Sequence, residues 1–214
     1  MSMIRTTLYL VRHGKTEWNT MGLMQGWGDS PLTEEGIRGA QAIRDALKTI
    51  PFAAAYTSSS QRAIDTARII MEYHKNMPLE TDEDLREIYF GKWEGLKYRQ
   101  LAIEFPEEHR NLMLHADKYI PENSGGETYP AMLTRMERAL KRIATKHKGS
   151  FVLIVSHGIS LSSILKHLQG VPLKDLRVNC HFPNSSISTI EYDEDGQFHI
   201  TAIGRTDHLP EDIR

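Results

Sequence analysis

Three short apolar segments along the chain have the pattern of buried β-strands. They span residues 7–11, 52–56 and 151–155, and the first and last are rich in leucine and β-branched residues. Between the first two, over residues 33–50, apolar residues recur at helical spacing behind an acidic first turn. Because strands and helices alternate, we predict an α/β fold of three layers, α/β/α. Helices would cover both faces of a mostly parallel central sheet.

The remaining elements are predicted from weaker patterns. Further helices are expected over residues 60–73, 97–105, 129–146 and 159–168. Two alternating segments, 186–192 and 199–203, predict strands, and the acidic residues and glycine between them predict a hairpin. The polar stretch at about 96–123 is expected to be a lid-like insertion over the sheet edge. The sequence contains no internal repeat and no linker, so we predict a single domain over residues 1–214.

The composition fits this fold and narrows the function classes. With 214 residues, 40% of them hydrophobic and 25% charged, the chain can bury a sizeable core. Its formal net charge of −2 gives no general electrostatic reason to bind nucleic acid or an anionic membrane. No run approaches the ~20 apolar residues that span a bilayer, and the first residues lack a signal-peptide pattern. The single cysteine, Cys180, cannot form an internal disulfide, so we expect a cytoplasmic protein.

Basic side chains follow the three central strands. Arg12 and His13 follow the first strand, Arg62 comes shortly after the second, and His157 follows the third. Because the carboxyl ends of parallel strands meet at one edge, where helix amino termini also point, we expect these side chains to converge. Each of them alone is more often structural or solvated, but together they predict an anion site. Arginine binds phosphate oxygens through two parallel hydrogen bonds, so phosphate is the expected ligand.

Six motifs resemble those of one known family and occur in its order. They are LVRHGKTEWN at 10–19, QGWGDSPLTEEG at 25–36, SSSQRAIDTA at 58–67, LREIYFGKWEG at 85–95, SGGET at 124–128 and VSHGISL at 155–161. These motifs are similar to the signatures of the histidine phosphatase superfamily, which includes the cofactor-dependent phosphoglycerate mutases. The resemblance covers most of the chain and implies a phosphoglycerate mutase-like fold.

The resemblance also implies roles for individual residues. The expected nucleophile is His13, and the expected acid and base is Glu87. Three further catalytic residues are expected to line the phosphate pocket, namely Arg12, Arg62 and His157. Four further positions are expected to bind the substrate, namely Asn19, Gln25, Gly26 and Gly158. From the residues alone, Glu94 competes with Glu87 for the acid-base role. The choice of Glu87 therefore depends on the family pattern.

The activity that the resemblance implies is metal-independent hydrolysis of a small phosphomonoester through a phosphohistidine. Such an enzyme is a phosphoric monoester hydrolase of the histidine acid phosphatase type. Attack by an imidazole and acid-base catalysis by a single carboxyl group need no metal ion, so we expect no cofactor and no metal. The substrate and the oligomeric state cannot be read from the sequence. Basic residues in the insertion could bind a second anionic group or form a solvated face, namely His109, Arg110, His115 and Lys118.

Two other functions compete with this one. The first is a cofactor-dependent phosphoglycerate mutase, which would return the phosphoryl group to another oxygen of the substrate. Mutase sequences resemble ERHYG after the catalytic glutamate and GNSLR after the second histidine, whereas this chain has EIYFG and GISLS, which favours hydrolysis. The second is a non-catalytic module that binds a phospholigand or a protein, but such a module should have lost the nucleophile or the acid. A metal phosphatase would need clustered carboxylates or paired histidines at ligand spacing, which the sequence lacks.

Overall fold

A computed structural model describes residues 4–180 and 182–214, which fold around a six-stranded sheet with the order β3-β2-β4-β1-β5-β6. The strands are β1 (Thr6–Arg12), β2 (Phe52–Ser58), β3 (Leu79–Asp82), β4 (Phe151–Ser156), β5 (Ile187–Tyr192) and β6 (Phe198–Arg205). The four strands from β3 to β1 run parallel, while β5 pairs antiparallel with β1 and with β6. The predicted mostly parallel sheet and the terminal hairpin are therefore confirmed.

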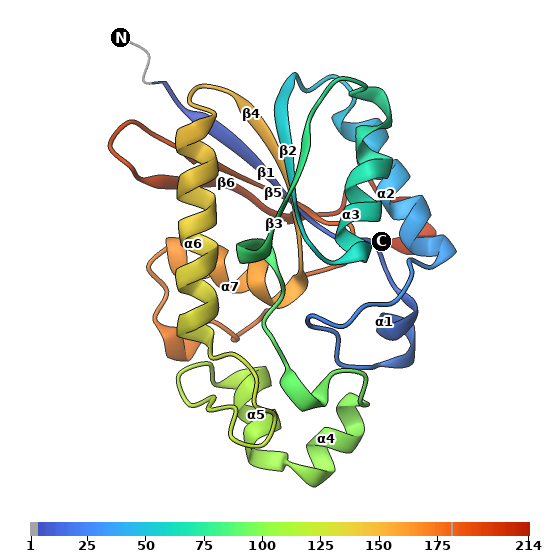
Figure 1. The fold of residues 1–214 in the computed structure, drawn as a ribbon, viewed down its shortest axis with the longest axis vertical. Coiled ribbons are helices and arrows are strands. Elements are labelled where there is room, and N and C mark those ends of the chain that lie inside the picture. The colour runs from blue at the N-terminus through green and yellow to red at the C-terminus, as the bar shows by residue number, and fades with distance from the viewer. Residues whose placement is uncertain (1–3, 181) are drawn as a thin grey trace.

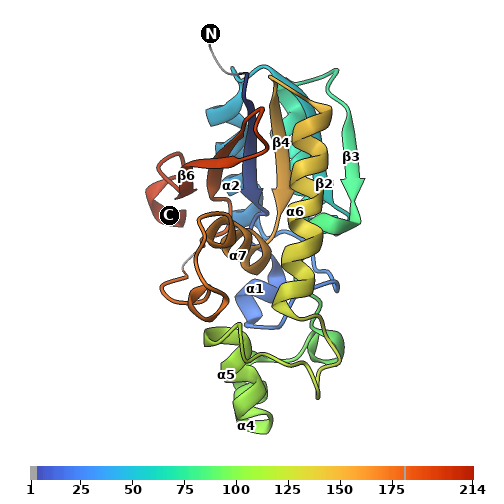
Figure 2. The same cartoon turned by 90° about the vertical axis from the view of Figure 1, so that its left-hand side faces the viewer.

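Helices cover both faces of this sheet, as predicted (Figures 1 and 2). The helices of the described residues are α1 (Glu17–Met21), α2 (Glu34–Leu47), α3 (Gln61–Ile70), α4 (Tyr98–Glu104), α5 (Pro106–Leu114), α6 (Tyr129–Lys146) and α7 (Gly158–Leu168). The apolar faces of α2 and α3 pack on one side of the sheet, and those of α6 and α7 pack on the other. The layers are thus helix, sheet and helix.

The central strands are apolar on both sides because both sides are covered. Leu8 and Leu10 of β1 are fully buried in the core beneath α6 and α7, whereas Val11 is buried in the core beneath α2 and α3. This alternation follows from the two-residue period of a strand, which points successive side chains to opposite faces. Continuous apolar runs are therefore the expected signature of such strands, and they explain why β1 and β4 could be predicted.

Three elements were not predicted from the pattern, namely helix α1, strand β3 and helix α5. Helix α1 has five residues, none of them buried, so it carries no periodic apolar signal. Strand β3 lies at the sheet edge and contains Leu79 as its single apolar residue, so it carries almost no hydrophobic signal. Helix α5 begins at Pro106 and follows α4 directly within the insertion. Proline is favoured in the first turn of a helix because the missing N–H is not needed there, so Pro106 starts a second helix after the one predicted over residues 97–105. The views in Figures 1 and 2 both place α4 and α5 beyond the carboxyl ends of the parallel strands.

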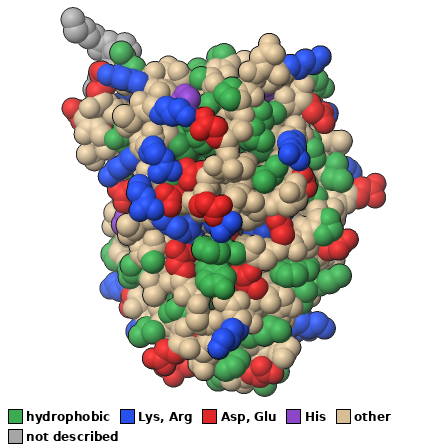
Figure 3. All heavy atoms as spheres, viewed as in Figure 1, with side chains coloured by type: hydrophobic (Ala, Val, Ile, Leu, Met, Phe, Trp, Pro, Cys, Tyr) green, Lys and Arg blue, Asp and Glu red, His purple; other side chains and the backbone are tan. Residues whose placement is uncertain are grey.

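The exposed surface carries both signs of charge. On the face drawn in Figure 3, acidic and basic side chains are interspersed, which agrees with a formal net charge of −2. Among the helices of the described residues, none combines the length and the apolar character that crossing a membrane requires.

Candidate active site

The His13 ring lies directly after β1, and its two nitrogens have different partners. Nδ1 lies 2.7 Å from the carbonyl oxygen of Gly14. Because a carbonyl oxygen can only accept, Nδ1 must carry the ring proton. Nε2 is then unprotonated and accepts a hydrogen bond of 3.3 Å from Nε of Arg62. His13 is 4% exposed, and burial, aided by the charges of Arg62 and Arg12, holds its pKa well below the usual value. The imidazole is therefore neutral at physiological pH.

Arg62, in the first turn of α3, connects the two histidines. Its Nη2 donates to the carbonyl oxygen of Gly26 at 2.7 Å and to Nδ1 of His157 at 3.0 Å. Its Nη1 donates to Gly28 and to a carboxylate oxygen of Asp29 at 3.1 Å. The guanidinium is thus fixed on all sides and compensated by one carboxylate.

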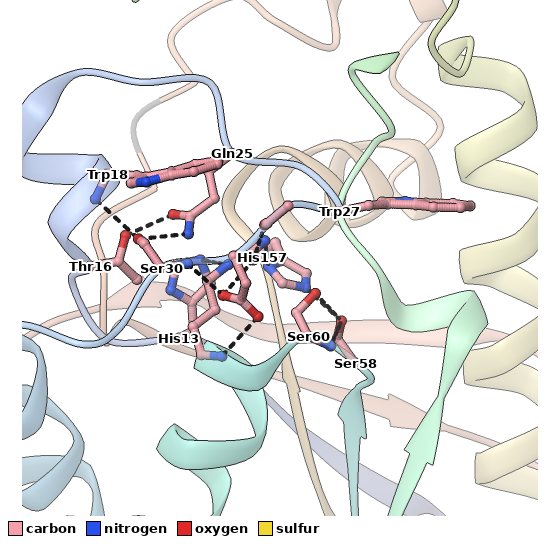
Figure 4. Close-up of polar contacts among 12 residues, drawn as sticks. His13, Thr16, Trp18, Gln25, Trp27, Ser30, Ser58, Ser60 and His157 are labelled. Atoms are coloured by element: carbon pink, nitrogen blue, oxygen red, sulfur yellow. Dashed lines mark hydrogen bonds and ion pairs between the residues drawn. The ribbon is translucent and has the colours of Figure 1, made fainter. Parts of the chain in front are cut away.

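His157 has the opposite tautomer to His13. Nδ1 accepts from Arg62, so the proton lies on Nε2, which donates to the Ser58 hydroxyl at 2.7 Å. The residue is fully buried, and burial, followed by the charge of Arg62, holds its pKa well below the usual value. Figure 4 shows the rings of His13 and His157 next to each other, with their centroids 5.1 Å apart.

Arg12, the last residue of β1, reaches across the amino terminus of α7. Its Nη1 donates to the carbonyl oxygen of Phe182. Its Nε is buried and has no hydrogen-bond partner among the described residues, which leaves a donor for a ligand. Gly158 makes this path possible, because a Cβ atom at that position would lie 3.0 Å from Cζ of Arg12.

Glu87 and Glu94 occupy distinct environments. Glu87 is 5% exposed, and its carboxylate accepts hydrogen bonds from the backbone N–H groups of Ile159 and Ser160 at 2.9 and 2.8 Å, at the amino terminus of α7. Glu94 instead accepts from the backbone N–H groups of Trp27 and Gly28. Glu87 lines the cavity beside His13, and Glu94 is not among the residues that line it. The geometry therefore favours Glu87 as the carboxyl that can reach a substrate.

The loop after His13 adds an amide layer to the site. The Gln25 carbonyl oxygen accepts from the Thr16 hydroxyl at 2.7 Å, and its amide donates to Ser30 at 3.0 Å, as Figure 4 shows. Asn19 sits in α1 and accepts from the Asn184 amide at 3.3 Å. The Asn184 amide also donates to the backbone carbonyl of His13 at 3.1 Å. These contacts hold the Asn19 and Gln25 side chains at the cavity wall.

A cavity of about 350 Å³ opens at this site. The predicted residues that line it are Arg12, His13, Asn19, Gln25, Glu87 and Gly158. Arg62, His157 and Gly26 do not line it; Arg62 and His157 contact the His13 ring, and Gly26 supplies a carbonyl to Arg62. The insertion contributes Tyr98 and Met113 to the wall.

Four residues of the site were missed at the sequence level. They are Asp29, Ser58, Arg177 and Asn184, which hold Arg62, His157 and the cavity wall. Asp29 lies in the quoted motif QGWGDSPLTEEG and Ser58 is the last residue of β2, so position gave a signal for these two. Arg177 and Asn184 lie between α7 and β5, where no periodic pattern marks them. Within residues 4–180 and 182–214, no group of three or more His, Cys, Asp or Glu side chains is arranged to hold a metal ion.

Known proteins are similar to this chain in sequence and in fold. The histidine phosphatase superfamily (branch 1) matches residues 8–205. The chain is 36% identical over 169 residues to the adenosylcobalamin/alpha-ribazole phosphatase of Salmonella typhimurium, covering 79% of this chain and 82% of that one. It is 34% identical to the probable phosphoglycerate mutase GpmB of Yersinia pestis over 94% of both. The solved structure of Bacillus stearothermophilus YhfR superimposes with a TM-score of 0.91 at 36% identity, covering 96% of this chain and all of that one. The chain therefore belongs to the histidine phosphatase superfamily.

Proposed function

We propose that the protein hydrolyses a small phosphomonoester through a phosphohistidine on His13. The observation that carries this proposal is the fixed tautomer of a neutral, buried ring at the cavity wall. The Gly14 carbonyl holds the proton on Nδ1, so the lone pair of Nε2 is the nucleophile. When a phosphoryl group binds, its oxygens would take over the Arg62 donor that Nε2 now accepts from. Nε2 would then be free to attack phosphorus in line.

Positive charge and fixed donors would stabilise the transferring group. Arg12 offers its unpartnered Nε at the cavity wall, and Arg62 is held rigidly behind His13 by Asp29 and two backbone carbonyls. Negative charge spreads over the equatorial phosphoryl oxygens during transfer, and preorganised donors of this kind stabilise it. His157 would keep Arg62 aligned through its Nδ1.

Glu87 would serve in both half-reactions. As a carboxylic acid it would protonate the leaving alkoxide oxygen while the P–O bond breaks and the N–P bond to His13 forms. As a carboxylate it would then remove a proton from water, whose oxygen attacks phosphorus and releases His13 and inorganic phosphate. The carboxyl group is held at the amino terminus of α7, so its place does not change between the two steps.

We further propose that residues 96–123 act as a lid. Tyr98 and Met113 reach the cavity from α4 and α5, which gives the insertion direct contact with any bound substrate. The acid phosphatase type and a cytoplasmic location remain predictions from the sequence.

The relatives include both phosphatases and a probable mutase, so hydrolysis must be distinguished from transfer of the phosphoryl group back to the substrate. Alpha-ribazole phosphatases and a probable phosphoglycerate mutase both resemble the chain at similar identity. The segments EIYFG and GISLS, where mutases resemble ERHYG and GNSLR, favour the phosphatase. A mutase would move phosphate between two oxygens of phosphoglycerate without releasing it.

The test measures inorganic phosphate released from p-nitrophenyl phosphate and alkyl phosphomonoesters in excess EDTA, without bisphosphoglycerate. Turnover by the wild type that disappears in His13→Ala supports the proposal. His115→Ala, which alters a histidine outside the cavity lining, is the matched control and should retain turnover. Full activity in His13→Ala would contradict the nucleophile assignment. Phosphoglycerate isomerisation without phosphate release would favour the mutase. The pH profile of phosphate release by the wild type would test the acid phosphatase type.

A further inference from the structure

Arg177 is a buried cation on the cavity wall that lacks a carboxylate partner. It is 9% exposed, and its Nη1 contacts only the Ser162 hydroxyl at 3.4 Å and the Cys180 sulfur at 3.3 Å. Its Nε is buried without a hydrogen-bond partner in the described part of the chain. Within that same part, no acidic side chain forms an ion pair with Arg177. A guanidinium left in this state carries a desolvation penalty that no carboxylate offsets.

Two other arginines of low exposure have carboxylate partners. Arg62 is paired with Asp29 at 3.1 Å and Arg135 with Glu127 at 2.8 Å. The one carboxylate that lines the cavity, Glu87, already accepts hydrogen bonds from backbone N–H groups at α7. The cavity therefore has more positive charge than its own residues neutralise, so a bound anion would stabilise it.

The position of Arg177 separates it from the phosphoryl-binding group. Arg62 and Arg12 are the arginines that lower the pKa of His13. Arg177 instead contacts Ser162 of α7 and Cys180, and it lines the same cavity as Tyr98 of the insertion. A compact substrate in a cavity of about 350 Å³ could reach both regions.

We propose that Arg177 is a specificity-determining residue that binds a second anionic group, a carboxylate or a phosphate, on the leaving group of the substrate. This inference rests on the proposed function, because it assigns another part of the wall of the same cavity. Tyr98 and Ser162 line the cavity as well. The Tyr98 hydroxyl can donate to the anion, whereas the Ser162 hydroxyl donates to the Ile159 carbonyl oxygen at 3.2 Å. Arg177 is thus a better candidate for binding a second anionic group than the basic residues of the insertion. None of these lines the cavity, namely His109, Arg110, His115 and Lys118.

The test compares matched phosphomonoesters that differ by one charge. Phosphooxypropanoate is compared with propyl phosphate, and propanediol bisphosphate with hydroxypropyl phosphate, which identifies carboxylate or phosphate as the preferred group. The first pair has no hydroxyl to accept a phosphoryl group, so mutase activity cannot interfere. The wild type should prefer the charged member of at least one pair in kcat/KM by about 10- to 100-fold, the worth of a charge-assisted hydrogen bond.

Arg177→Met should abolish this preference, and Arg177→Lys should keep part of it, since lysine retains the charge but not the planar fork. Circular dichroism and thermal unfolding establish that each variant is folded. Arg110→Met, an exposed arginine of the insertion, is the control and should keep the full preference. The proposal is overturned if neither pair shows a preference in the wild type, or if the preference survives in folded Arg177→Met.

A binding measurement separates this proposal from the proposed function. Cys180, the single cysteine of the chain, lies 3.3 Å from Arg177 and lines the cavity. In His13→Ala, which should not turn over substrate, phosphooxypropanoate or propanediol bisphosphate should slow alkylation of Cys180 at least threefold more than its less charged counterpart. If this charge-dependent protection is found but neither the wild type nor any variant releases phosphate, the second-anion site is supported and the phosphatase is not. Equal protection by both members of each pair, in an active enzyme, would refute the site alone.

Discussion

Two neutral histidines buried side by side should make the fold sensitive to acid. His13 and His157 are 4% and 0% exposed, and the pKa of each is held well below its usual value, chiefly by burial. In the unfolded chain each regains a pKa of about 6.5. Below that pH the unfolded state takes up protons that the folded state does not bind, so the free energy of unfolding falls as the pH falls.

The size of this effect follows from the number of protons. From about pH 7.5 to about pH 5.5, each histidine lowers the free energy of unfolding by about 1.4 kcal/mol, and the pair by about 2.7 kcal/mol. Urea unfolding followed by tryptophan fluorescence at both pH values measures this fall. His157→Gln removes one titrating group but keeps an amide that can donate to Ser58, so its fall should be about 1.4 kcal/mol smaller than that of the wild type. His13→Asn should behave alike.

The control keeps both histidines and removes a hydrogen bond. Ser58→Ala loses the acceptor for Nε2 of His157, so it should lower the free energy of unfolding by a similar amount at each pH. Comparing differences between proteins cancels the contributions of the remaining titrating groups. Parallel pH dependences in the wild type, His157→Gln and His13→Asn would refute the conclusion that these rings are neutral in the folded state.

Three substitutions probe the roles of individual groups in the site. Glu87→Gln should reduce kcat/KM for alkyl phosphates about 100- to 10,000-fold and kcat/KM for p-nitrophenyl phosphate far less. The ratio kcat/KM reports formation of the phosphohistidine, and nitrophenolate leaves in that step without a proton. Equal losses in kcat/KM would argue against the acid role. Gly158→Ala places a Cβ 3.0 Å from Cζ of Arg12, and the displaced guanidinium should raise the inhibition constant of inorganic phosphate about tenfold. An unchanged inhibition constant would mean that Arg12 does not bind phosphate. Asp29→Asn leaves Arg62 without its carboxylate, and the free energy of unfolding should fall by about 1–2 kcal/mol. This is less than the ~3–5 kcal/mol of a fully buried pair, because the Asp29 side chain is 27% exposed. An unchanged urea midpoint would contradict this prediction.

Elements with a strong periodic pattern could be predicted from the sequence. Helix α6 spans Tyr129–Lys146, as predicted, because an amphipathic stripe continues from the Thr128 cap to the last turn. Strand β3 could not be predicted, since pairing with β2 rather than its own residues makes Leu79–Asp82 a strand. Tertiary pairing of this kind leaves no local signal.

The site was predictable where topology dictates it. Strand ends of a parallel sheet converge, so Arg12 and His13 had to meet the residues after β2 and β4. Glu87 lies after no central strand, and it was distinguished from Glu94 only by the family pattern; in the structure the contact with α7 distinguishes them. Arg177 reaches the cavity from a turn after α7, and only the folded chain places it there.

The most direct test of the proposed chemistry is to trap the covalent intermediate. The protein is mixed with a radiolabelled phosphomonoester, quenched in alkali within one turnover and digested, and the labelled peptide is sequenced by mass spectrometry. We expect an acid-labile, alkali-stable phosphate on His13 that forms and decays as fast as turnover and is absent from His13→Ala. Label on another residue, or turnover by the wild type with no labelled intermediate on His13, would contradict the central claim.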